Sequence, residues 1–174
     1  LTELGILKIK EGALIDATIV NSPRKPHLPK VLEIADDRED ERSEAQKQQE
    51  NDYHQQLRYT NPGIDHEARF VKKGKRCYYG YKHHVCTDKR GLVLKLHTTP
   101  ANRNDTKELP NLLESASLPE RTRVFADKGY DSASNRSCLR ERKLRDGIMR
   151  RKVKGKEFPK WEEVRNRAIS KRRC

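Results

Sequence analysis

Two aspartates in this 174-residue chain stand where carboxylates are costly. Asp16 lies inside the apolar run 13–20, and Asp127 directly follows the apolar residues 124–126. Such runs are typical of buried strands, where a carboxylate needs a counter-charge. If neighbouring strands bring two carboxylates to about 4 Å, their repulsion is about 4 kcal/mol at an effective dielectric constant of about 20. A bound divalent cation removes that cost.

The chemistry that such a pair would support is phosphodiester cleavage and transfer. Carboxylates can hold two metal ions, of which one activates the attacking oxygen and the other stabilises the leaving oxygen. Hard oxygen ligands favour Mg²⁺ or Mn²⁺ over zinc. Composition and spacing alone leave a second interpretation open, in which each aspartate is an N-cap or turn residue that accepts hydrogen bonds from the nearby backbone.

The charge of the chain points to a polyanionic partner. The formal net charge is +13, and residues 136–174 hold 16 Lys and Arg against 5 Asp and Glu. Neutralising phosphates releases counterions, so a concentrated basic surface suits nucleic acid, although a solvated basic face with no partner has the same composition. The sequence has no membrane-spanning apolar run and no signal peptide, and its four cysteines are scattered, so we expect a protein of the cytoplasm.

The elements that position the aspartates follow from local patterns. The hydrophobic fraction of 33% is enough for one modest core. Segment 6–20 predicts a short hairpin that ends in a buried strand, and Asp105 can cap a helix whose start Pro110 can shift later. The remaining expectations are strands at 77–86, 92–99, 121–127 and 148–149, a helix from Ser132 or Ser134 to about Lys143, and a final helix around 161–169.

Residues 21–75 interrupt this α/β pattern. The segment begins with three prolines and continues through an acidic, Gln-rich run. Such a composition buries too little apolar surface to offset chain entropy. We therefore expect a long polar insertion after the first core strand that is mobile or partly helical.

Four blocks together carry a family resemblance. They are residues 15–20, residues 72–75 with 79–85, residues 98–102 with Asp105, and residues 126–132. In this order they resemble the catalytic domain of bacterial insertion-sequence transposases of the insertion sequence five group. The blocks extend over nearly the whole chain, which makes the resemblance specific.

The resemblance implies a fold, a site and a substrate. The fold would be ribonuclease-H-like, a mixed sheet flanked by helices, and residues 1–174 would be a partial catalytic domain of that kind. Asp16 and Asp127 match the first two acids of a DDE triad that binds two Mg²⁺. The complete form would cut and join double-stranded DNA at insertion-sequence ends and target sites, as a homodimer in the bacterial cytoplasm at the nucleoid.

The third acid of the triad is where the sequence departs from the family pattern. In the family, a glutamate follows a helix start that resembles residues 167–173, a few positions beyond Cys174. Glu162 and Glu163 lie several turns too early to replace it. The fold and the metal site are therefore expected to be incomplete at the C-terminus, and the helical DNA-binding region that usually precedes the domain in the family is expected to be missing from this sequence as well.

Phosphate contacts are assigned from charge alone. Lys82, Arg136, Lys152 and Arg172 are the candidates. Two other functions stay open. A non-catalytic nucleic-acid-binding remnant could stack bases on the tyrosines of segment 78–83, although ordinary strand packing explains those tyrosines as well. A zinc site of Cys77, His83, His84 and Cys86 is disfavoured because strand alternation divides these residues between two faces.

Overall fold

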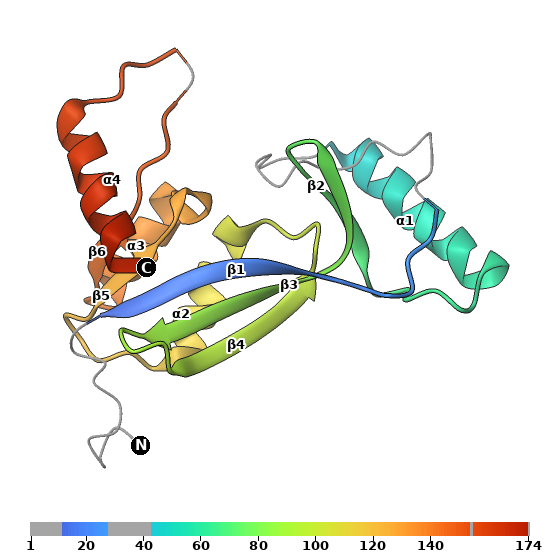
Figure 1. The fold of residues 1–174 in the computed structure, drawn as a ribbon, viewed down its shortest axis with the longest axis horizontal. Coiled ribbons are helices and arrows are strands. Elements are labelled where there is room, and N and C mark those ends of the chain that lie inside the picture. Colours follow the sequence, from blue (N-terminus) through green and yellow to red (C-terminus); the bar gives the residue numbers. More distant parts are fainter. Residues whose placement is uncertain (1–11, 28–42, 154, 174) are drawn as a thin grey trace. The chain divides into compact units, whose positions relative to one another are not determined.

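A computed structural model describes residues 12–27, 43–153 and 155–173 (Figure 1). The chain divides into two compact units. The first unit comprises residues 1–17, 84–97 and 105–174, and the second comprises residues 18–83 and 98–104. The strands Ala13–Asn21 (β1), Arg76–Asp88 (β3) and Val93–Pro100 (β4) each contain residues of both units. The predicted hairpin partner at 6–11 lies outside the described residues.

The described strands form a mixed sheet in the order β2-β3-β1-β5-β6, with β4 paired to β3. β1 pairs with β5 and β5 pairs with β6 in parallel, whereas β2 and β3 are antiparallel. A mixed sheet flanked by helices confirms the predicted α/β class and agrees with a ribonuclease-H-like fold. The bounds are Ala13–Asn21 (β1), Arg69–Lys73 (β2), Arg76–Asp88 (β3), Val93–Pro100 (β4), Arg123–Ala126 (β5) and Arg145–Ile148 (β6).

The first unit packs helices against the parallel strands. Its helices are α2 (Leu109–Ala116), α3 (Ala133–Glu141) and α4 (Lys160–Arg173). The core joins Ile15, Val124 and Ala126 of the strands with Leu112 of α2 and Leu139 of α3, all of them fully or almost fully buried. Burial of these side chains on one face of β1 and β5 fixes the register of the two strands.

The segment after Asp105 differs from the predicted single helix. Asp105–Lys107 form a short 3-10 turn, η2, and α2 begins only at Leu109. Pro110 lies in the first turn of α2, where its missing N–H has no intrahelical partner to lose. Pro110 therefore favours a helix start at Leu109, and Asp105 is not the N-cap of α2.

The second unit contains a strand where only a polar insertion was expected. α1 (Glu44–Thr60) begins at a capping box in which Ser43 and Gln46 exchange hydrogen bonds. β2 then pairs with β3, with Phe70 opposite Tyr79. A small core of Ile64, Ala68, Phe70 and Tyr79 holds these elements together. β2 forms a strand because it pairs with β3, although the composition of segment 21–75 does not by itself predict one.

His54 on α1 is buried without a hydrogen bond. The residue is 4% exposed, and neither ring nitrogen has a partner in the described structure. Its ring stacks on Tyr79 with centroids 6.2 Å apart. Burial, reinforced by the charges of Arg69, His66 and Arg58, lowers the pKa of His54 to about 4. The imidazole is therefore neutral in the folded chain at neutral pH.

Acid is expected to destabilise the second unit through this histidine. In the unfolded chain His54 takes up a proton near its ordinary pKa of about 6.5, whereas the folded chain resists protonation until about pH 4. Stability is unaffected above pH 6.5 and falls as the pH drops through this window, by up to about 3 kcal/mol. Denaturant unfolding at pH 7 and pH 4.5 checks the difference. His54→Phe should reduce the loss between the two pH values, and an equal loss in the variant would assign it to other groups.

Candidate functional site

Asp16 and Asp127 directly follow the last paired residues of the parallel strands β1 and β5. The parallel pairing runs through Ala13↔Val124, Leu14↔Phe125 and Ile15↔Ala126, and the residues that follow are Asp16 on β1 and Asp127 just after the end of β5. Residues at paired positions of parallel strands project on the same face of a sheet. Ile15 and Ala126 are fully buried just before them. Two carboxylates thus follow the buried paired residues of two adjacent parallel strands, where the apolar core ends.

The turn after β5 orients the Asp127 carboxylate. Asp127 caps the 3-10 turn Lys128–Tyr130 (η3), and its Oδ1 accepts a hydrogen bond from the Gly129 N–H at 2.6 Å. A Cβ at position 129 would lie 2.9 Å from that oxygen and 3.2 Å from Oδ2 of Asp105. A side chain at position 129 would therefore make both carboxylates shift from their present positions.

Asp105 is the carboxylate that sequence reasoning assigned only to helix capping. The turn that carries it is fixed to η3, because the Thr106 hydroxyl donates to the Gly129 carbonyl at 2.8 Å. The Asn135 side-chain amide donates to the carbonyls of Thr106 and Tyr130, each at 2.9 Å. Position 105 lies far from Asp127 in sequence, and only the resemblance block that contained it drew attention to it.

The pKa of Tyr130 reflects the negative charge around its hydroxyl group. Burial raises the pKa of Tyr130 first, and the charges of Asp105, Asp127 and Asp16 raise it further, while Arg173 lowers it. The ring is fully buried, and Nδ1 of His84 lies 3.4 Å from the phenol oxygen. Three carboxylates therefore act on one buried hydroxyl, and a bound cation would relieve the excess negative charge.

A protein cation already accompanies the first aspartate. Nη2 of Arg173, at the end of α4, lies 3.1 Å from Oδ1 of Asp16. The Asp16 side chain is 67% exposed, so this ion pair is open to solvent and to competing cations. The preceding Arg172 lies over the Phe125 ring at 5.9 Å, which places the end of α4 near β5.

The carboxylates suit a hard cation, but their ligand set is incomplete. Within the described ranges, no group of three or more His, Cys, Asp or Glu side chains is arranged to hold a metal ion. Neither the aspartates nor the cysteines and histidines of β3 form such a group in the described residues. Carboxylate oxygens on adjacent strands match the donor type that Mg²⁺ and Mn²⁺ require, and further ligands would have to come from water, substrate or other protein groups.

Two of the four predicted phosphate contacts have partners inside the protein instead. Lys82 is 2% exposed, and its Nζ donates to the Arg103 carbonyl at 2.8 Å. Arg136 is 7% exposed and forms ion pairs with Asp131, at 2.6 Å, and with Asp146. Burial and internal pairing remove both side chains from DNA, which corrects those two assignments. Lys152 and Arg172 are exposed and stay candidates.

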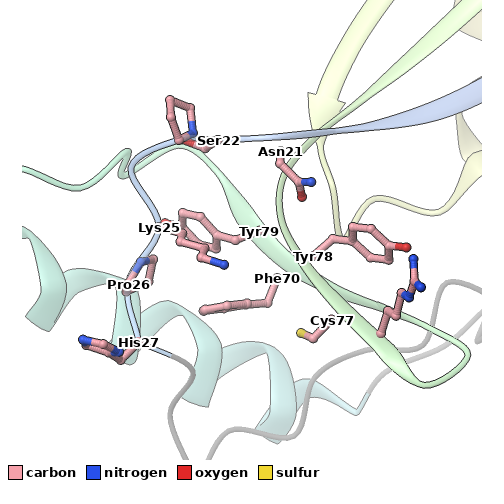
Figure 2. Close-up of a pocket in the computed structure, with 11 residues that line it drawn as sticks. Asn21, Ser22, Lys25, Pro26, His27, Phe70, Cys77, Tyr78 and Tyr79 are labelled. Atoms are coloured by element: carbon pink, nitrogen blue, oxygen red, sulfur yellow. The ribbon is translucent and has the colours of Figure 1, made fainter.

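The second unit holds a cavity of about 570 Å³ between the segment after β1 and the β2–β3 hairpin (Figure 2). Lys25, Pro26 and His27 line one side, and Phe70 and Tyr79 belong to the other. None of its lining residues is acidic, so the cavity is no candidate for the cation.

The aromatic side chains of this cavity belong to the packing of the second unit. The Tyr79 ring lies 4.6 Å from the Phe70 ring, and its hydroxyl donates to the Asp65 carbonyl at 2.7 Å. Both rings are almost fully buried. These contacts favour the packing interpretation of Tyr79 over base stacking.

Comparisons with known proteins identify the family to which the chain is similar. A family model described as a transposase DDE domain matches residues 8–174. The chain is 40% identical over 175 aligned positions to a transposase for insertion sequence element IS1106 of Neisseria meningitidis serogroup B. The alignment covers 99% of this chain and 54% of the relative, so the chain spans about half the relative's length. No solved structure matches.

A search of the described helices for a membrane span found no helix long and apolar enough.

Proposed function

Because the chain belongs to the transposase DDE domain family, we propose that it forms the metal-binding part of a DNA transposase catalytic domain. The complete protein would cleave the ends of an insertion sequence and transfer the freed strands to target DNA. The observation that carries the proposal is that Asp16 and Asp127 directly follow Ile15 and Ala126, the last paired residues of two adjacent parallel strands. We assign the element to the insertion sequence five group on the four sequence blocks described above.

Asp16 and Asp127 are the residues that would hold the divalent cations. Mg²⁺ or Mn²⁺, when bound, activates an attacking oxygen and stabilises the leaving oxygen of the phosphodiester. The Gly129 N–H keeps the Asp127 carboxylate directed by its hydrogen bond to Oδ1. Arg173 balances the charge of Asp16 in the present arrangement and would share that carboxylate with a bound cation.

The partners follow from this chemistry. The substrate is double-stranded DNA, namely insertion-sequence ends and a target site, and Lys152 and Arg172 are exposed cations that could contact its phosphates. Since two ends must be joined in one event, we propose a homodimer for the complete form. The activity would take place at the nucleoid in the bacterial cytoplasm.

Titration of this chain with Mn²⁺ by calorimetry tests the proposal. We expect binding that disappears in Asp16→Asn and in Asp127→Asn, because each substitution removes one charged ligand while it preserves the shape of the side chain. Asp52→Asn, which removes one charge from α1, should leave the binding unchanged. Equal Mn²⁺ binding by the parent chain and both site variants would reject the proposed site.

A non-catalytic DNA-binding remnant is the alternative function. The net charge of +13 supports DNA binding under either function. Under this alternative, Asp127 would act only as the cap of η3 and Asp16 only as the ion-pair partner of Arg173.

A further inference from the structure

Three arginines gather where β5 and β6 begin, at the opposite end of the strands from the aspartates. Arg123 and Arg145 are partners in the parallel register, and Arg121 precedes β5 by two residues. We call Arg121, Arg123 and Arg145 the basic edge. All three side chains are exposed.

The basic edge lacks counter-charges within the part of the chain that the structure describes. No ion pair or side-chain hydrogen bond is found there for any of its three guanidinium groups. Two acids are adjacent to the basic edge in sequence: Glu120 pairs with Lys143 at 2.7 Å, and Asp146 pairs with Arg136 and Arg165. Like charges at facing positions of neighbouring strands destabilise a sheet, so the Arg123–Arg145 pair costs stability in the isolated chain.

The backbone holds the basic edge in a fixed arrangement. The Arg121 N–H donates to the Lys143 carbonyl at 2.8 Å, and the Arg145 N–H donates to the Thr122 carbonyl at 2.9 Å. Arg121 and Lys143 both adopt left-handed backbone conformations, with φ of 67° and 54°. Residues other than glycine rarely adopt this backbone conformation, which persists only where the surrounding contacts impose it.

We propose that the basic edge is a second DNA-contacting surface that binds phosphates of a duplex away from the scissile bond. This inference rests on the proposed function, which supplies DNA as the partner. Arginine binds phosphate through planar, bidentate hydrogen bonds, and two facing arginines without protein partners present such donors together. From Arg123 to Asp127 β5 rises about 13 Å, so a phosphate bound at the basic edge is not the one held at the aspartates.

The salt dependence of duplex DNA binding by this chain tests the inference. Each phosphate contact contributes about 0.9 to the slope of log affinity against log salt concentration. Arg123→Gln/Arg145→Gln should therefore lower the magnitude of the slope by about 1.8 relative to the parent chain. Arg123→Lys/Arg145→Lys keeps both charges and should preserve most of the slope. Thermal unfolding of each variant verifies that it is folded.

A matched control removes the same charge elsewhere. Lys75→Gln/Arg76→Gln changes two exposed cations of the β2–β3 turn, and we expect a smaller change in slope. An unchanged slope in Arg123→Gln/Arg145→Gln, or a change no larger than that of the control pair, would overturn the inference. A parent chain that does not bind a duplex would overturn it too, whereas Mn²⁺ binding at Asp16 and Asp127 still decides the proposed function separately.

Discussion

Asp127→Asn is expected to reduce Mg²⁺-dependent DNA strand cleavage about a thousandfold. The protein to assay is a longer one that contains this chain and has the full length of its relative. A metal ion supplies several kcal/mol of transition-state stabilisation, and each 1.36 kcal/mol changes the rate tenfold. Asparagine retains the Oδ1 acceptor for the Gly129 N–H, so the η3 turn stays capped while the charged ligand is lost. Cleavage of a labelled duplex that carries an insertion-sequence end measures the rate.

Two comparisons make the Asp127 result specific. DNA binding by Asp127→Asn should remain as salt-sensitive as in the parent protein, because the substitution removes no cation. Asp52→Asn should cleave at the parent rate, since that carboxylate lies on the exposed face of α1. If folded Asp127→Asn keeps cleaving within tenfold of the parent rate, the metal-binding role of Asp127 is wrong.

Arg136→Ala is expected to destabilise the first unit by about 3 kcal/mol. The buried guanidinium joins Asp131, which also accepts the Arg151 N–H at 2.6 Å, to Asp146 on β6. Removing the arginine leaves Asp131 with the longer contact to Arg150 at 3.9 Å and Asp146 with the contact to Arg165 at 3.4 Å, and losing the buried partner costs more than the ion pair itself contributes. Thermal unfolding should show a melting temperature lower by about 10 °C.

The same variant separates a structural role from a DNA contact. Arg136→Ala should leave the salt dependence of DNA binding unchanged at a temperature where it is folded, because the side chain is not exposed. Lys143→Ala breaks the exposed pair with Glu120 and should have little effect on stability. A stable Arg136→Ala with a reduced salt slope would restore the original assignment to phosphate binding.

Local patterns predicted the elements whose order depends on their own residues. Strands β3, β4 and β5 and helices α3 and α4 were expected near their observed positions, because alternation, turn residues and Ser132 as a cap are readable in sequence. β6 begins at Arg145, three residues before the predicted start, since its register follows β5 rather than its own composition. β2 was missed for a similar reason: its polar sequence becomes a strand only by pairing with β3.

The candidate site was predictable in part. Asp16 and Asp127 stood out because each follows apolar residues, whereas the parallel pairing of the strand residues just before them is a tertiary property. Asp105 approaches Gly129 from the η2 turn, which ends before α2 and its Pro110 begin. No local sequence pattern encodes that approach. Arg136 and Lys82 were assigned to DNA by charge, but burial and internal acceptors decide the role of a cation, and sequence composition reveals neither.

The most direct test is to locate manganese by anomalous scattering in crystals of this chain grown with Mn²⁺. We predict an anomalous peak in contact with carboxylate oxygens of both Asp16 and Asp127. A peak that contacts neither aspartate, or no peak at occupying concentrations of Mn²⁺, would contradict the account.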